Sequence, residues 1–179
     1  MRLVGFTGSL RKASYNRTLL RTLGELLPEG ASLEILDPGV LPLFNQDLEK
    51  DFPATAKDFK EKIRGANGVI IATPEFNRSI PGVLKNAIDW TSRPYGDNVF
   101  QGKKVLVLGA SGGNVSTALA QYDLKKILLY LDARMMGQPE VMIGNILGKL
   151  DASGALTDAP TRDFLRGAIK KFVAFVKTT

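Results

Sequence analysis

The sequence alternates short apolar segments with longer amphipathic ones, and this alternation restricts the fold more than any other feature. Strands are expected at residues 2–7, 31–36, 68–72 and 104–109, with a fifth around 133–136 that continues near 140–143. Helices are expected at residues 15–27, 54–65, 81–92, 115–131 and 161–177. Short strands rich in Val, Ile and Leu are typical of a parallel sheet covered by helices on both faces. Five such βα repeats predict a doubly wound α/β sandwich, and the length predicts a single domain, residues 1–179.

Three loops of this fold are candidates for a common binding site. In doubly wound sheets, ligands bind beyond the carboxyl ends of the strands, where the strand order reverses. The loops after the first, third and fourth strands should therefore converge; they are residues 8–16, 73–82 and 110–116. All three are rich in Gly, Pro, Ser or Asn. A fourth irregular segment, residues 37–53, is punctuated by prolines and carries apolar residues that suggest packing, with a partner subunit as one option.

The first loop has the components of a phosphate site. It joins a strand to the N-terminus of a helix, which offers unpaired N–H groups and partial positive charge. Ser9, Ser14 and Asn16 add neutral donors, and Arg11 adds a charged, forked one. The spacing matches neither the Walker loop nor the GxGxxG fingerprint of dinucleotide sites. A single phosphate monoester, such as that of FMN, fits this set of donors.

The second loop could hold the ring of a flavin. Pro74 and the pair Pro81-Gly82 stiffen it and start the next helix. A flavin ring needs backbone donors at one edge and an apolar plane beside it, which the N–H groups of residues 75–78 and the Phe76 ring could supply. An ordinary surface turn before a helix would explain the proline and glycine equally well.

Two missing residue types exclude much of enzyme chemistry. The chain contains no cysteine and no histidine. Disulfides, thiolate catalysis and Ser-His-Asp systems within one chain are therefore excluded, and no metal site is expected. Proton or hydride chemistry must come from a cofactor or from other side chains. With no secretory or membrane-spanning pattern in the sequence, a cytoplasmic location is expected.

The net charge of +6 favours anionic small molecules as ligands. Nucleic acid is not expected as a partner, because no run of five basic residues occurs and basic and aromatic residues are not interleaved. A solvated basic surface without any ligand remains the alternative.

Taken together, the three loops resemble a known family. Their sequences are GSLRxxSxN at 8–16, PEFNxSxPGxLKNAxDW at 74–90 and GASxG at 109–113. These motifs resemble those of the NAD(P)H-dependent FMN reductases, most closely the branch called chromate reductase or soluble quinone reductase. The likeness covers roughly residues 2–145, and its most specific part is residues 74–90. It implies a flavodoxin-like three-layer sandwich with a five-stranded parallel sheet in the order 2-1-3-4-5. It also implies bound FMN and assembly into dimers or tetramers, with the flavin near the subunit interface.

The resemblance also implies roles for individual residues. The FMN phosphate would lie on Ser9, Arg11, Ser14, Tyr15 and Asn16. The isoalloxazine ring would lie on Pro74, Glu75, Phe76 and Asn77, with Ser111 flanking it from the third loop. Arg78 would contact NADPH or NADH, and Tyr122 and Glu140 would lie at a subunit contact near the active site. For Tyr122, plain core packing of its helix is the alternative.

Two departures from the family pattern are visible. Phe76 stands where the family usually has Tyr, so a phenol hydrogen bond is absent. The third loop, Ser111-Gly112-Gly113, lacks the bulkier residue that many relatives carry after the serine.

The expected activity is reduction of quinones by NADPH or NADH through bound FMN, with chromate, azo or nitro compounds as further acceptors. The flavin carries the chemistry, so no side chain is assigned as a catalytic acid. Two other functions are open. One is a flavodoxin-like electron carrier or flavin-binding module, although carriers of that type are usually acidic for docking. The other is a phosphatase or response-regulator-like domain, which would need a carboxylate after the first strand, where Thr7-Gly8-Ser9 stands.

Overall fold

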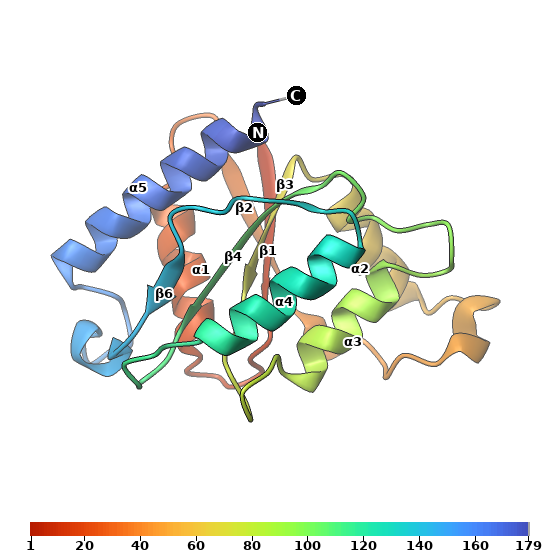
Figure 1. The fold of residues 1–179 in the computed structure, drawn as a ribbon, viewed down its shortest axis with the longest axis horizontal. Coiled ribbons are helices and arrows are strands. Elements are labelled where there is room, and N and C mark those ends of the chain that lie inside the picture. The colour runs from red at the N-terminus through yellow and green to blue at the C-terminus, as the bar shows by residue number, and fades with distance from the viewer. Residues whose placement is uncertain (179) are drawn as a thin grey trace.

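A parallel sheet forms the centre of the computed structural model, which describes residues 1–178 (Figure 1). Its strands are β1 (Arg2–Thr7), β2 (Ser32–Leu36), β3 (Gly68–Ala72), β4 (Lys104–Ala110), β5 (Arg134–Met135) and β6 (Val141–Ile143). The order is β2-β1-β3-β4-β5, and β6 also pairs with β4. The expected order 2-1-3-4-5 is confirmed. Its fifth position is shared by two short strands, which pair with opposite ends of β4.

Helices cover both faces of this sheet and complete three layers. They are α1 (Tyr15–Glu25), α2 (Ala54–Arg64), α3 (Gly82–Thr91), α4 (Ala118–Tyr130) and α5 (Ala159–Val176), with short 3-10 turns at Pro38–Val40, Gln46–Glu49 and Ile146–Lys149. Successive strand residues point to opposite faces. In β3, for example, Val69 and Ile71 pack with α2, α3 and α4, whereas Ile70 packs with α1 and α5. Because the strands are apolar on both faces, they contribute side chains to two hydrophobic cores, one on each face of the sheet.

The helix ends lie within three residues of the expected ones. The largest difference is at α4, which was expected from residue 115 and begins at Ala118. Ser116 has φ 56°, in the left-handed region, so the backbone cannot continue as a right-handed helix through it. At α1 the expected start is confirmed, because Ser14 caps it by accepting a hydrogen bond from the Arg17 N–H at 3.2 Å.

The long segment between β2 and α2 packs on α3 of its own chain. Asn86 and Trp90 both donate hydrogen bonds to the Pro42 carbonyl, at 2.9 and 2.8 Å. The rings of Phe44 and Phe52 each meet the Trp90 indole edge-to-face, with centroids 5.0 Å apart. Such aromatic pairs add about 0.5–1.5 kcal/mol each beyond the area that they bury. Trp90 is therefore a core residue.

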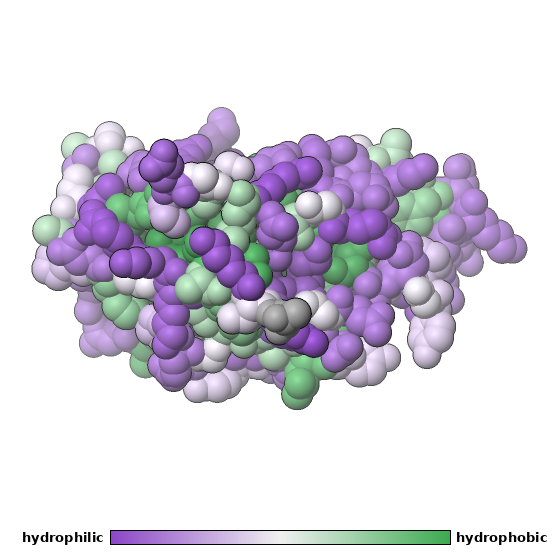
Figure 2. Space-filling view, turned by 90° about the horizontal axis from the view of Figure 1, so that it is seen from above, coloured by the Kyte–Doolittle hydropathy of each residue, from purple (hydrophilic) through white to green (hydrophobic). Residues whose placement is uncertain are grey.

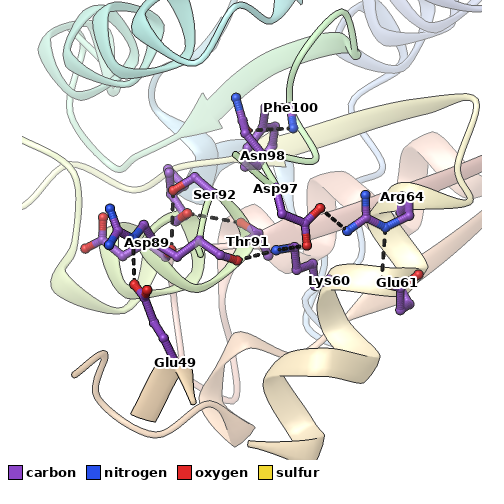
Figure 3. Close-up of polar contacts among 12 residues, drawn as sticks. Glu49, Lys60, Glu61, Arg64, Asp89, Thr91, Ser92, Asp97, Asn98 and Phe100 are labelled. Carbon is purple, nitrogen blue, oxygen red and sulfur yellow. Dashed lines mark hydrogen bonds and ion pairs between the residues drawn. The ribbon is translucent and has the colours of Figure 1, made fainter. Parts of the chain in front are cut away.

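A polar network ties α2 and the same segment to the loop between α3 and β4 (Figure 3). The Lys60 side chain is only 4% exposed; its ammonium pairs with Asp97 at 2.9 Å and donates to the Arg93 carbonyl. Arg64 pairs with the other oxygen of Asp97 at 2.7 Å, and Arg93 pairs with Glu49 at 2.6 Å. The buried ammonium is thus paired with a carboxylate and a carbonyl of a distant loop, as burial of a charge requires.

The surface at the amino ends of the strands is mostly hydrophilic, with scattered apolar patches (Figure 2). Among residues 1–178, no helix is both long and apolar enough to cross a lipid bilayer.

Candidate functional site

The loops after β1, β3 and β4 meet at the carboxyl edge of the sheet, which is the lower edge in Figure 1. They enclose a cavity of about 320 Å³, lined by Ser9, Arg11, Tyr15, Asn16, Pro74, Glu75, Phe76, Ala110, Ser111 and Gly112. A cavity of about 370 Å³ lies elsewhere, between α2 and residues 49–52. We take the first as the site, because ligands of doubly wound sheets bind at the strand ends where the order reverses. Of the ten residues proposed to contact FMN, eight line this cavity, and a ninth, Ser14, caps α1.

The first loop brings small polar groups to the start of α1. Gly8 permits this arrangement, since a Cβ there would lie 2.9 Å from the Pro81 ring of the second loop. Ser9 is nearly buried, and its N–H donates to the Thr7 hydroxyl at 3.2 Å. Arg11 stacks its guanidinium over the Tyr15 ring, 4.3 Å from the centroid. The loop therefore brings to the cavity the Arg11 guanidinium, the Ser9 hydroxyl and the free N–H groups of a helix start.

Two members of the expected phosphate set are engaged in holding the loop. Ser14 accepts the capping hydrogen bond of α1. Asn16 is 2% exposed, and its amide donates to the Ala110 carbonyl at 3.2 Å while accepting from the Ala110 N–H at 2.9 Å. Asn16 thus joins α1 to the end of β4, and its backbone N–H is the group left for a ligand.

The second loop contains a two-residue turn beside the cavity. Phe76 and Ser79 exchange two backbone hydrogen bonds, each 3.1 Å long. The residues between them, Asn77 and Arg78, both have positive φ, 52° and 66°. Phe76 is 57% exposed at the cavity rim, so its ring can serve as the apolar plane that the sequence suggested. Asn77 and Arg78 do not line the cavity.

Glu75 lines the cavity, and its carboxylate also binds the N-terminus of α4. One oxygen accepts hydrogen bonds from the N–H groups of Leu119 and Ala120, at 3.0 and 3.1 Å. The other lies 3.5 Å from Arg78, whose side chain is 75% exposed. Because the two partners on α4 are more than forty residues away in sequence, no local pattern identified this contact.

The third loop forms the remaining wall. The Ser111 hydroxyl accepts from the Gly113 N–H at 3.1 Å, and its own N–H donates to the Ile143 carbonyl of β6 at 3.1 Å. Gly109 permits the close approach of strand and helix here, since a Cβ would collide with the Thr117 side chain and the Thr73 carbonyl. Ala110, which belongs to the GASxG motif but was not predicted as a contact, lines the cavity as the last residue of β4.

Tyr122 and Glu140 lie together, although neither lines the cavity. Lys125 links them: its ammonium pairs with Glu140 at 2.6 Å and lies 4.8 Å from the centroid of the Tyr122 ring. Hydrogen bonding to Lys125, with a smaller contribution from Tyr122, lowers the pKa of Glu140 below its ordinary value. Tyr122 is 57% exposed, so it is not a core residue of the single chain.

The residues around this cavity fit FMN. The helix start with Ser9 and Arg11 suits a phosphate monoester, and Pro74, Phe76 and the glycine-rich third loop line the space beside it. The volume is at the lower end of the about 300–1,000 Å³ of small-molecule sites. Fold and site together define a nucleotide-binding α/β protein of the flavodoxin-like class.

Comparison with known proteins identifies the family. Residues 1–148 match the model of the NADPH-dependent FMN reductases. The chain is 42% identical to a 2-hydroxy-1,4-benzoquinone reductase from a Burkholderia species, with 99% of this chain and 97% of that protein covered. It is 45% identical to a quinone reductase from Pseudomonas putida, with 95% and 91% covered. The flavoenzyme FerB from Paracoccus denitrificans, an NAD(P)H:(acceptor) oxidoreductase, superposes with a TM-score of 0.91 at 40% identity, with 98% and 97% covered.

The chain therefore belongs to the NADPH-dependent FMN reductase family. It is an oxidoreductase with FMN as cofactor and NAD(P)H as electron donor.

Proposed function

We propose that this chain reduces quinones with NADPH or NADH, and that it does so as one flavodoxin-like FMN-binding domain. The observation that carries the proposal is the cavity at the sheet edge, which joins a phosphate cradle to an exposed aromatic plane. The names of the relatives support quinones as acceptors. Chromate, azo and nitro compounds are proposed as further acceptors, because a site open on one side accepts many planar or small oxidants.

The residues divide the binding of FMN between the three loops. Ser9, Arg11 and the N-terminus of α1, with Tyr15 and Asn16, would hold the phosphate, while Ser14 fixes the helix start. Pro74, Glu75, Phe76 and Asn77 with Ser111 would hold the ring. FMN supplies, when bound, the two-electron transfer between NAD(P)H and the acceptor. The protein's part is to bind, orient and leave one face open, which needs neither histidine nor cysteine.

Residues at the rim would select the electron donor and the acceptor. Arg78 is proposed to contact NADPH or NADH, because its exposed guanidinium projects from the turn beside the cavity. Tyr122 and Glu140 are proposed to lie at a subunit contact close to the site. Exposed apolar side chains on α4, among them Leu119 and Tyr122, support assembly into a homo-oligomer, a dimer or a tetramer. A cytoplasmic location is proposed because a chain without cysteine suits a reducing compartment.

The quinone proposal is tested by the stoichiometry of turnover. With the purified FMN-loaded protein, one NADPH should be oxidised for each 1,4-benzoquinone converted to hydroquinone. The Phe76→Tyr variant, which introduces the residue expected from the family resemblance, serves as a comparison for acceptor preference. The assay is run with NADPH and with NADH; if the quinone speeds the oxidation of neither above the rate with oxygen alone, quinones are not the acceptors.

A further inference from the structure

The turn at residues 76–79 has a backbone that its own sequence does not favour. Two-residue turns with positive φ at both central positions prefer Asn followed by Gly. Here Asn77 is followed by Arg78, whose φ of 66° is uncommon for a residue with a long side chain. Conformations of this kind persist when the surrounding structure over-determines them. Contacts from outside the turn should therefore hold it.

The first such contact is made just before the turn. Glu75 is about one-tenth exposed and accepts two N–H groups at the start of α4. That helix has no cap of its own, because the Thr117 side chain makes no capping hydrogen bond and the first turn holds no acidic residue. Glu75 thus supplies, from a distant loop, the anion that a helix N-terminus favours.

The second contact is made at the last residue of the turn. The Ser79 hydroxyl donates to Asp123 at 2.7 Å, and Asp123 lies one helical turn beyond Ala120 on α4. Lys126 holds the other oxygen of Asp123 at 3.1 Å. Both ends of the turn are therefore fixed to the same helix.

We propose that Glu75 and Asp123 are positioning residues for FMN binding: together they clamp the 76–79 turn onto α4 and so hold the cavity wall formed by Pro74 and Phe76. The proposal rests on the assignment of this cavity to FMN. Asp123 does not line the cavity, so it acts only through the turn. Glu75 also lines the cavity, so Asp123 is the residue that separates the clamp from direct contact with FMN.

The test is titration of the flavin-free full chain with FMN. Glu75→Ala, Asp123→Ala and Ser79→Ala should each raise the Kd for FMN by about five- to tenfold, the size expected when a capping or anchoring hydrogen bond of this kind is lost. The Kd of the double variant Ser79→Ala/Asp123→Ala should be no higher than that of either single variant, because each substitution removes the same Ser79–Asp123 hydrogen bond. Glu75→Gln retains an acceptor for α4 and should recover most of the affinity.

The matched control is Asp158→Ala. Asp158 caps α5 by accepting from the Thr161 N–H at 3.0 Å, and it lies outside the cavity lining. This variant should lower the Tm and leave the Kd for FMN unchanged. Amide hydrogen exchange in residues 76–79 of the flavin-free chain should speed up in Glu75→Ala and Asp123→Ala and not in Asp158→Ala.

Three results distinguish failure of the clamp proposal from failure of the proposed function. A raised Kd in Glu75→Ala with an unchanged Kd in Asp123→Ala would make Glu75 a direct ligand and overturn the clamp. Unchanged hydrogen exchange in residues 76–79 in both variants would overturn it independently of flavin. Failure of the unmodified chain to bind FMN would overturn the proposed function instead, and the exchange data would still decide on the clamp.

Discussion

At the scale of single residues, the site depends on side chains whose partners lie far away in the sequence. Ser9, Arg11 and Phe76 could be predicted, because a strand–turn–helix junction and an exposed aromatic residue are local features. The partners of Asn16 and Glu75 could not, since they are 94 and about 44 residues distant. Asn16 and Glu75, which the sequence suggested as ligand contacts, therefore also hold the loops in place.

The structure predicts that Asn16 contributes strongly to stability. In Asn16→Ala both backbone groups of Ala110, a residue only 2% exposed, would lose their partner. The free energy of unfolding should fall by about 2–4 kcal/mol, from about 1–3 kcal/mol for each unsatisfied buried group. Urea unfolding measures this. Asn114→Ala, at an exposed asparagine of the third loop, is the control and should change the free energy by less than about 0.5 kcal/mol. An equally small effect of Asn16→Ala would refute the structural role.

Arg78 provides a prediction about the electron donor. If its guanidinium contacts NADPH or NADH, Arg78→Ala should raise the KM for that donor about tenfold, the loss expected for a hydrogen bond to a charged group. The kcat should change little, because removal of ground-state binding acts on KM. Steady-state kinetics with both nucleotides will show which donor is affected. An unchanged KM for both removes Arg78 from the donor site.

At the scale of elements, the strands and helices could be predicted because apolar periodicity is a local property. The start of α4 is the exception: residues 115–117 were expected to be helical and are not. The cause is the left-handed backbone of Ser116, which the amino-acid pattern does not indicate. The segment at residues 37–53 has no periodicity, so only the structure shows that it packs on Trp90 of α3. The ion pairs that hold this region come from three separate elements.

Asp97 makes these ion pairs dependent on pH. Its hydrogen bond to Lys60, and a second one to Arg64, lower its pKa below the ordinary value. A carboxyl with a lowered pKa in the folded state stabilises the protein above its unfolded pKa of about 3.9, and this stability is lost as the pH falls through the folded pKa. Asp97→Asn should therefore lower the free energy of unfolding at pH 7, and the difference from the unmodified chain should shrink below about pH 4.

The expected size is about 1–3 kcal/mol at pH 7, less than the about 3–5 kcal/mol for a fully buried pair. The reduction reflects solvent screening, because the Asp97 side chain is 46% exposed. Glu61→Gln is the control, since it removes an exposed partner of the same Arg64. Urea unfolding across this pH range checks the prediction, and a difference that stays constant down to pH 3 contradicts it.

At the scale of the whole molecule, the three-layer architecture places three loops with different tasks at one edge of the sheet. The order 2-1-3-4-5 could be predicted through the family resemblance, and it explains why β1, β3 and β4 supply the cavity. The exposed apolar side chains of α4 lead to a further prediction. Static light scattering should give two or four times the 19.4 kDa of one chain, and a value equal to one chain would contradict assembly.

The central claim is that this cavity holds an FMN that NAD(P)H reduces. The most direct measurement is an absorbance scan from about 300 to 550 nm of the FMN-loaded protein, before and after anaerobic addition of NADPH or NADH, in the flavin region. The structure predicts flavin bands that bleach with at least one of the two nucleotides. Bands that persist with both would favour an electron carrier or flavin-binding module. No bound flavin after addition of FMN would contradict the assignment of the three loops.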